Sequence, residues 1–263
     1  QNFTAIFTGK ANNGTISTPI ARGTYSGANY FNGGNKVTND DDNWNLIGNP
    51  YPSAIDAVKF LTANTDLDGF VRVWMHSTPI SNSNQNPFYG NFVYNYSSSD
   101  YLAINGTGTS RPGALSVVGA GQGFFVDAAA TGTVFFNNTI RLAGSNGQFF
   151  RPGGPTNQSQ SIEKHRLWVN IVNNQGAYKQ ALIGYLTGAT NERDMRYDAE
   201  LTEAGNTVSI YSLLNQDKLT IQGRALPFQV ADVIPLGVRT TLAGEFTIQL
   251  ENFDGIFAEG QNI

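Results

Sequence analysis

The clearest pattern along the chain is a series of short stretches in which apolar and polar residues alternate. Early examples are DGFVRVWMH (68–76), GQGFFVDA (121–128) and TVFFNN (133–138), and HRLWVNIVN (165–173) places Leu167, Val169 and Ile171 on one face. A period of two is typical of β-strands, because successive side chains point to opposite faces of a sheet. Each stretch therefore predicts a strand.

The strand pattern continues at regular spacing to the end of the chain. The later stretches are YKQALIGYL (178–186), TVSIYSLL (207–214), KLTIQGRAL (218–226), DVIPLGVR (232–239) and GEFTIQLENF (244–253). Gly, Asn and Asp separate them, as an antiparallel sandwich requires. We therefore expect an all-β fold with two tandem antiparallel β-sandwich domains, the second of them immunoglobulin-like.

One short helix is expected after the stretch NLIGNPYPSAID (45–56). Ser53 fits an N-cap whose hydroxyl accepts from the backbone N–H of Asp56, while the Asp56 carboxylate returns the bond and favours the positive end of the helix dipole. Ile55, Val58 and Leu61 follow at three-residue spacing on one face. This face predicts a helix that closes one end of the first sheet.

The same corner also resembles the strand, glycine turn and helix that build phosphate cradles and exposed nucleophiles. A cradle needs consecutive backbone N–H groups, but Pro50 and Pro52 have none and Gly48 stands alone. Ser53 lacks the flanking glycines of a nucleophile elbow. We interpret the corner as structural, with Tyr51–Pro52 as a candidate cis peptide bond.

A domain boundary is expected at PGGPTNQSQS, residues 152–161, because proline, glycine and uncharged polar residues contribute nothing to a core. We predict an Asn/Gly-rich β-sandwich domain over residues 1–151, a linker over 152–161 and the immunoglobulin-like domain over 162–263.

Composition narrows the classes of partner. Only 14% of residues are charged, the net charge is −4 and the sequence pI is about 5.1. No basic field is present to hold nucleic acid. Cysteine is absent, which excludes disulfides and thiolate sites.

No apolar run reaches the roughly 18 residues that cross a bilayer, so we expect no membrane insertion. The chain begins at Gln1 without a basic leader, which we interpret as a processed or trimmed fragment.

Candidate metal and catalytic residues are few, and we assign no catalytic, cofactor-binding or metal site. Asp40, Asp41 and Asp42 precede Trp44, and DLDG (66–69) matches half of a calcium loop. The distant bidentate glutamate is missing, so no cofactor is expected and calcium is left open. The two histidines, His76 and His165, are far apart and lack ligand spacing for zinc. The sequence singles out no pair of carboxylates that could act together in glycoside cleavage.

A group of aromatic residues lies among Asn, Ser and Gly and offers the best indication of binding: Trp74, Tyr89, Phe92, Tyr94, Tyr96 and Tyr101. Such a mixture stacks on sugar faces, but aromatic side chains also fill sandwich cores, as the alternation in FVYNYSSSDY (92–101) suits equally well. The pattern leaves both interpretations open. Asn105-Gly106-Thr107 is a sequon, and the sequence does not decide whether it is glycosylated.

Ordered blocks of residues resemble a known group of bacterial proteins. The blocks are NLIGNPYPSAIDAVKFL, DGFVRVWMHSTPIS, GAGQGFFVDA and TVFFNNTIR, then HRLWVNIVNNQGAYKQALIGYLTGATN, YDAE, LTIQGRALPF and VIPLGVRTTLAGEFTIQLENFDGIF. From about Asn43 to Ile263, the chain resembles the C-terminal region of Bacteroidota surface and secreted proteins exported by the type IX secretion system, with a type C sorting signal. The terminal sorting strands of that group would follow FAEGQNI.

The resemblance implies an all-β fold, an extracellular or outer-surface location and a role in display, adhesion or assembly rather than catalysis. We therefore expect a non-catalytic structural or adhesive module, not an enzyme, with filament or matrix assembly through unpaired sheet edges as one mode. Its expected partners are other surface proteins, copies of itself and glycans. The alternative is an accessory carbohydrate-binding module of a secreted polysaccharide-degrading enzyme.

Overall fold

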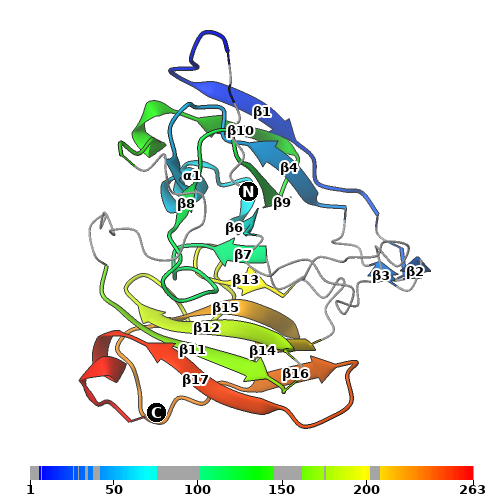
Figure 1. The fold of residues 1–263 in the computed structure, drawn as a ribbon, viewed down its shortest axis with the longest axis vertical. Coiled ribbons are helices and arrows are strands. Elements are labelled where there is room, and N and C mark those ends of the chain that lie inside the picture. The colour runs from blue at the N-terminus through cyan, green and yellow to red at the C-terminus, as the bar shows by residue number, and fades with distance from the viewer. Residues whose placement is uncertain are drawn as a thin grey trace.

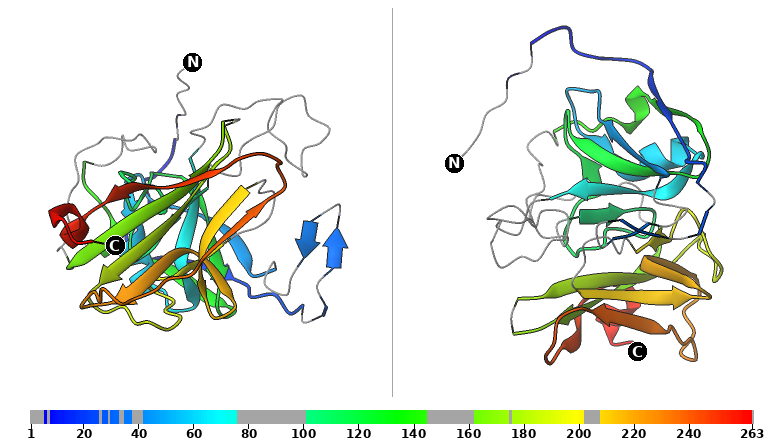
Figure 2. Two further views of the ribbon diagram at one scale, coloured as in Figure 1. Left: turned by 90° about the horizontal axis from the view of Figure 1, so that it is seen from below. Right: turned by 90° about the vertical axis from the view of Figure 1, so that its right-hand side faces the viewer.

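The computed structural model describes residues 6, 8–25, 27–28, 30–32, 35–37, 42–75, 101–144, 162–174, 176–201 and 208–262. The fold is all-β and sandwich-like, as the alternating stretches predicted. Strands of the first half lie in the upper part of Figure 1 and those of the second half in the lower part. The right-hand view of Figure 2 shows the same two layers from the side.

The first half contains ten short strands, one α-helix and one 3-10 helix among its described residues. They are β1 (Ile16–Ile20), β2 (Tyr30–Asn32), β3 (Asn35–Val37), β4 (Trp44–Gly48), β5 (Ile55–Asp56), α1 (Ala57–Ala63), β6 (Leu67–Trp74), β7 (Tyr101–Ile104), β8 (Val117–Val118), β9 (Gly123–Ala128), β10 (Gly132–Phe136) and η2 (Asn138–Ile140). Strands β4, β9, β6 and β7 form one antiparallel sheet in that order, and β1–β10, β2–β3 and β5–β8 pair separately.

The second half contains longer strands. They are β11 (Lys164–Val172), β12 (Tyr178–Leu186), β13 (Ala199–Glu200), β14 (Val208–Leu214), β15 (Asp217–Ala225), β16 (Leu236–Thr240) and β17 (Thr247–Phe253), followed by the 3-10 helix η3 (Gly255–Glu259). Each alternating stretch of the sequence from residue 165 onward thus overlaps one of these strands.

Aromatic packing anchors the core of the first half. The ring of Phe60 from α1 stacks on Phe136 with centroids 4.9 Å apart and meets Phe124 edge-on at 5.4 Å. All three side chains are fully buried. The helix therefore packs against β9 and β10 through Phe60.

The predicted helix cap was wrong in its position. Asp56 is the N-cap of α1, and its Oδ1 accepts from the backbone N–H groups of Val58 and Lys59, each at 3.0 Å. The chain is still extended before this point, because Ile55 and Asp56 pair with β8. Helical geometry therefore begins after Asp56 rather than after Ser53.

The buried face of the helix also differs from the prediction. Ala57 and Phe60 are buried, whereas Val58 and Leu61 are only partly buried. A start at Ala57 rotates the helix relative to the expected register. Ile55 is buried as a strand residue instead.

The corner before the helix is structural, in agreement with the interpretation of the sequence. The buried Asn49 side chain donates to the carbonyl oxygens of Ser53 and Gly119, both at 2.9 Å, and accepts from the N–H of Tyr51 at 3.0 Å. Tyr51–Pro52 was wrong as a cis candidate, since the cis peptide bond in the described residues is Leu226–Pro227.

The second half forms one seven-stranded sheet with the order β16-β14-β15-β12-β11-β17, and β13 adds to β15. All of its pairs are antiparallel except β12 with β15. The sheet folds back on itself, because Val208 and Ile210 of β14 pack on Ile171 of β11 and Ala181 of β12. The immunoglobulin-like arrangement of this half stays a prediction.

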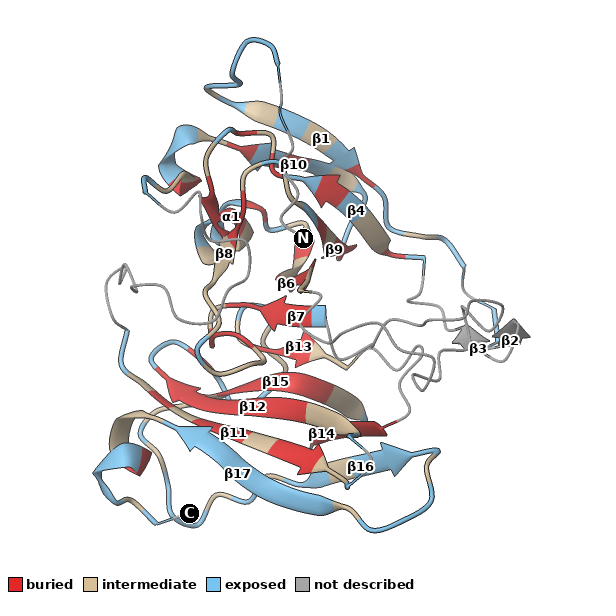
Figure 3. Ribbon diagram, in the orientation of Figure 1, coloured by how far each residue is buried: buried red, intermediate tan, exposed pale blue. Residues whose placement is uncertain are grey.

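The two faces of β11 have different environments. Leu167, Val169 and Ile171 point into the core of the second half, as their spacing predicted. Trp168, on the opposite face, belongs to a buried cluster that joins the halves and contains Phe70, Ala103, Trp168, Leu182, Ala199 and Ile221. Figure 3 shows buried residues from β6 and β7 through β13 to β15 and β12. The linker expected at 152–161 lies outside the described residues.

Candidate functional site

Charged and polar side chains gather at the junction between the two halves. Arg72 of β6 is 9% exposed, and its Nη2 donates to the backbone carbonyl oxygen of Glu200 in β13. The guanidinium carbon lies 5.3 Å from the ring centroid of Trp44 and 5.2 Å from that of Phe70. Burial lowers the pKa of Arg72 to about 10, so the side chain is a cation at neutral pH. It stacks on two rings of its own half and reaches the second half through its hydrogen bond to Glu200.

A loop of the first half, residues 105–109, inserts into the second half. The backbone N–H of Gly106 donates to the carbonyl oxygen of Arg196 at 3.0 Å, and its carbonyl oxygen accepts from the Lys164 ammonium at 2.7 Å. The indole N–H of Trp168 donates to the carbonyl oxygen of Thr109 at 3.0 Å. Backbone groups of one half therefore have their hydrogen-bond partners in the other half, which fixes the relative position of the two halves.

Asn105 shapes this loop. Its Oδ1 accepts from the N–H groups of Thr107 at 2.9 Å and Gly108 at 3.3 Å, which makes an Asx turn. The Asn105 side chain is fully buried. The sequon is therefore a structural turn, and its amide is inaccessible to glycosylation in the folded chain.

An ionic cluster around Arg193, which we call the Arg193 cluster, lies beside this loop. The guanidinium is 3.1 Å from Asp68 of the first half, 3.4 Å from Glu200 and 3.8 Å from Asp198. The Asp198 side chain is fully buried and accepts from the N–H groups of Gly223 at 2.8 Å and Asp194 at 2.6 Å. Burial raises the pKa of Asp198 to about 6, against these hydrogen bonds and the Arg193 charge.

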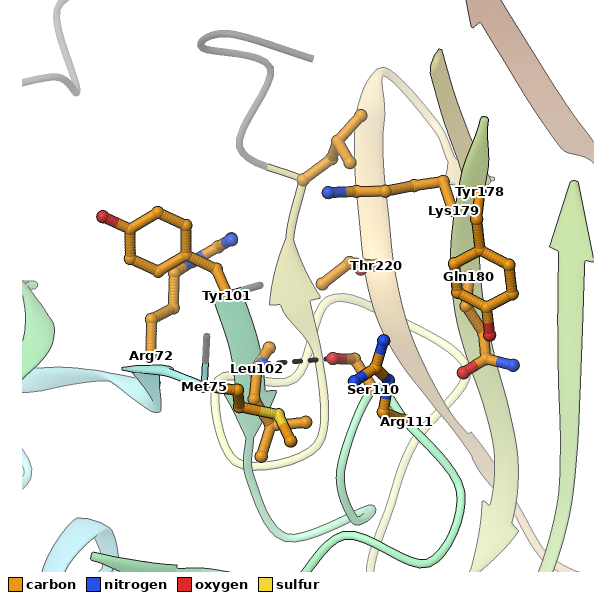
Figure 4. Close-up of a pocket in the computed structure, with 12 residues that line it drawn as sticks. Arg72, Met75, Tyr101, Leu102, Ser110, Arg111, Tyr178, Lys179, Gln180 and Thr220 are labelled. Carbon is orange, nitrogen blue, oxygen red and sulfur yellow. Dashed lines mark hydrogen bonds between the residues drawn. The ribbon is translucent and has the colours of Figure 1, made fainter. Parts of the chain in front are cut away.

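A cleft opens at the edge of the junction, between β7 and the following loop on one side and β12 and β15 on the other (Figure 4). Its open volume, including solvent at the mouth, is about 510 Å³. Arg72, Arg111 and Lys179 contribute positive charge, and Tyr101 and Tyr178 contribute rings. No carboxylate is among the described residues that line the cleft. The cleft therefore suits a polar or anionic group better than a cation.

One wall of the cleft is held by a carboxylate on β17. Oε2 of Glu251 accepts from the Tyr178 hydroxyl at 2.6 Å, from Asn170 Nδ2 at 2.7 Å and from Gln180 Nε2 at 2.5 Å. Burial, followed by this hydrogen bond, raises the pKa of Tyr178. The tyrosine is thus a fixed neutral hydroxyl at physiological pH.

Of the aromatic residues that the sequence grouped, the structure describes Trp74 and Tyr101. Trp74 and Tyr101 form an edge-to-face pair with centroids 4.7 Å apart, and Tyr101 lines the cleft. Tyr89, Phe92, Tyr94 and Tyr96 lie outside the described residues, and so does the FVYNYSSSDY stretch before Tyr101.

The histidine and acidic residues that the sequence analysis singled out make structural contacts, as far as the structure describes them. His165 is buried, and its Nδ1 accepts from the N–H of Ile256 at 3.3 Å. Asp68 of the DLDG stretch faces Arg193, and Asp42 accepts from the N–H of Tyr25 at 3.1 Å. His76, Asp40 and Asp41 lie outside the described residues.

The described part of the chain contains no group of three or more His, Asp or Glu side chains placed to hold a metal ion. Asp68 of the DLDG stretch lies in β6, and Asp66 lies in the turn before this strand. The question of calcium binding stays open, as the sequence left it. Among the same residues, no helix has the length and apolar character needed to span a bilayer.

Several residues of the junction were missed by the sequence analysis. Arg72 was taken as one polar position in an alternating strand, and Asp198 was noted only as part of YDAE. A charge on the outer face of a strand has the same pattern whether water or another sheet covers it. The sequence signal for this site was therefore absent.

Comparison with known proteins identifies one family. The family described as "Domain of unknown function (DUF8693)" matches residues 1–263, and the chain belongs to it. No curated protein and no solved structure matches the chain.

Proposed function

We propose that this chain is a non-catalytic structural and adhesive module of a secreted or cell-surface bacterial protein. The observation that carries the proposal is the junction, where two β-rich halves are joined by a shared buried cluster, inserted backbone and the Arg193 cluster. Hydrogen bonds and ion pairs that are buried in this way resist separation, since opening the junction would leave their groups unsatisfied. A module with this construction transmits force between its ends as one unit.

The arrangement of charged groups supports the non-catalytic part of the proposal. Asp68, Asp198 and Glu200 surround Arg193 rather than a cavity. Each of these carboxylates therefore neutralises a structural cation. The described residues that line the cleft include cations and tyrosines but no Asp or Glu, so they do not supply the two carboxylates of glycoside hydrolysis.

The proposed location is the extracellular or outer cell surface. It is supported by the resemblance of the chain to the C-terminal regions of Bacteroidota proteins exported by the type IX secretion system. The polar, glycine-rich loops of the first half are also typical of exposed surfaces. Partners on this proposal are other surface proteins, further copies of the chain and glycans.

The proposal is tested by measuring attachment and turnover side by side. The purified chain is coated on inert beads, and attachment of the beads to bacterial cells and to insoluble glycans is compared with albumin-coated beads. The same protein is incubated with soluble polysaccharides, and release of reducing ends is measured. We expect attachment above the albumin control without release. Release of reducing ends by the isolated chain would contradict the proposal.

The cleft supports a second candidate function, an accessory carbohydrate-binding module. Tyr101 and Tyr178 offer ring faces, while Arg111 and Lys179 offer donors for hydroxyl or carboxylate groups of a sugar. The test compares retention on insoluble glycans of the wild type, Tyr101→Ala and Tyr25→Ala. The two tyrosines are both 38% exposed, so Tyr25→Ala is a matched control away from the cleft. Loss of retention in Tyr101→Ala alone would favour this function, and equal retention of all three would exclude the cleft as the sugar site.

A further inference from the structure

The seven-stranded sheet of the second half ends in two edges, β16 and β17. These strands are joined by residues 241–246 but are not hydrogen-bonded to each other. They diverge from that loop in the left-hand view of Figure 2. Every residue of β17 is exposed, and Figure 3 shows both strands mostly in the colour of exposed residues.

Apolar side chains line the inner side of both edges. Ile248, Leu250 and Phe253 pair with Ile171, Val169 and Leu167 of β11, whose side chains point into the core. Directly paired residues share a face of the sheet. The three side chains on β17 therefore point inward too, yet they are 51%, 41% and 44% exposed.

The facing edge has the same character. Val238 of β16 pairs with Ile210, which is buried in the core, and Leu236 lies two positions away on the same face. Their exposures are 42% and 40%. The interior of the second half is therefore open between β16 and β17, with apolar side chains on both sides of the opening.

The open edge lacks the features that normally protect an edge strand. Charged residues that point inward, or proline, commonly block pairing with another chain. The only charged residue in β17 is Glu251, and its carboxylate is bound on the opposite face by Asn170, Tyr178 and Gln180. An unpaired edge with an apolar inner face is the acceptor for an added β-strand.

The chain itself contains a segment suited to this acceptor. In FTAIFT (3–8), Phe3, Ala5 and Phe7 alternate with Thr4, Ile6 and Thr8, which is a strand pattern with strong β-formers. Ile6 is 82% exposed, and residues 8–13 are exposed as well. Six extended residues span about 20 Å, which matches the length of β17.

The geometry points to strand addition between copies: residues 3–8 of one copy pair with the free edge of β17 in another, and their apolar face covers Ile248 and Leu250. This inference rests on the proposed structural function and names its partner and contact. Donor and acceptor are different surfaces, so the contact is heterologous, and it builds open filaments where the rotation between copies does not close a ring.

The test uses full-length chains altered on one side of the contact. Phe3→Asp with Phe7→Asp removes the donor face, and Ile248→Lys charges the acceptor face. Ile248 is about half exposed, so this change is compatible with folding. Val233→Lys is the matched control, because Val233 is 80% exposed and lies outside the strands. Mass is measured by size-exclusion chromatography with light scattering over a range of concentrations.

We expect the wild type and Val233→Lys to form oligomers whose mass grows with concentration, and each one-sided variant to be monomeric. A mixture of the donor variant and the acceptor variant should give a complex of twice the monomer mass and nothing larger, because each species retains one half of the contact. A wild type that stays monomeric would overturn the inference. Oligomers that persist in either variant would overturn it as well. Neither result bears on attachment or glycan turnover, which test the proposed function separately.

Discussion

Arg193 and Asp68 form an ion pair across the junction, with 3.1 Å between Nη2 and Oδ2, although they belong to different halves of the chain. Their side chains are 22% and 17% exposed. Burial raises the pKa of Asp68, while the Arg193 charge opposes the shift. The pair is thus a partly desolvated contact that holds the two halves in register.

Removing Arg193 is expected to destabilise the fold strongly. Arg193→Ala leaves Asp68 and the buried Asp198 without their shared cation, and an uncompensated buried charge costs about 3 kcal/mol or more. Chemical denaturation followed by tryptophan fluorescence gives the free energy of unfolding. Lys59→Ala, at an exposed position on α1, is the control and should change it by less than about 0.5 kcal/mol. Equal stabilities of the two variants would refute the role of the Arg193 cluster.

Asp198 is expected to make stability depend on pH. Its pKa is raised from the ordinary 3.8 to about 6 by burial. Between these values the folded state holds a proton that the unfolded state releases. The contribution of Asp198 to stability is therefore fully present below pH 3.8 and is lost as pH rises through about 6.

The measurement compares the unfolding free energy of the wild type and Asp198→Asn between pH 4 and pH 7. The raised pKa of Asp198 should change the difference between the two unfolding free energies by on the order of 3 kcal/mol over this pH range. The variant cannot titrate, and its amide faces two backbone N–H donors, so it should be the less stable protein throughout. A difference that stays constant with pH would contradict the raised pKa.

Gly69 is expected to tolerate no side chain. Its φ is +45°, and an added Cβ would overlap the carbonyl oxygen of Met195 in the other half. Gly69→Ala should cost more than about 2 kcal/mol, because strain and a backbone clash add together. Gly113→Ala is the matched control, since Gly113 also has a positive φ, +73°, but open space around it. The control should cost only about 1 kcal/mol. Thermal and denaturant unfolding of both variants separate the cost of the backbone clash from the cost of the positive φ.

Removing the N-cap of α1 is expected to lower the stability by a smaller amount. Asp56→Ala removes the acceptor for two backbone N–H groups and should cost about 1 to 2 kcal/mol of stability. Ser53→Ala should cost less, because the hydroxyl accepts only from Arg141 Nε at 2.9 Å. Unfolding curves of the two variants test this order. The reverse order would restore Ser53 as the cap.

Local features of the sequence predicted much of the fold. The alternation in HRLWVNIVN gave β11 and placed Leu167, Val169 and Ile171 on its core face. The helix was expected at the correct corner, but its cap was misplaced by three residues. The pairing of Ile55 and Asp56 with β8 is a contact between distant segments. Such a contact overrides a local capping pattern, and the sequence of the corner alone carries no trace of it.

The candidate site could not be predicted in the same way. Arg72 and Trp168 lie on faces that an isolated sandwich would expose to water, and their hydrogen-bond partners are more than fifty residues away along the chain. Each partner is a backbone carbonyl oxygen whose position depends on the packing of the other half. No motif spacing records such pairs.

By itself, the sequence determined that its alternating segments are strands and which side of each of these is apolar, because alternation acts through the local geometry of the extended chain. Only the tertiary structure decided what covers the opposite sides. The outer faces of β6 and β11 meet each other and become a buried junction, while the inner faces of β16 and β17 stay uncovered. The physical reason is that burial is a property of the whole packed chain, so the same alternating pattern serves a solvated face, a junction and an open edge.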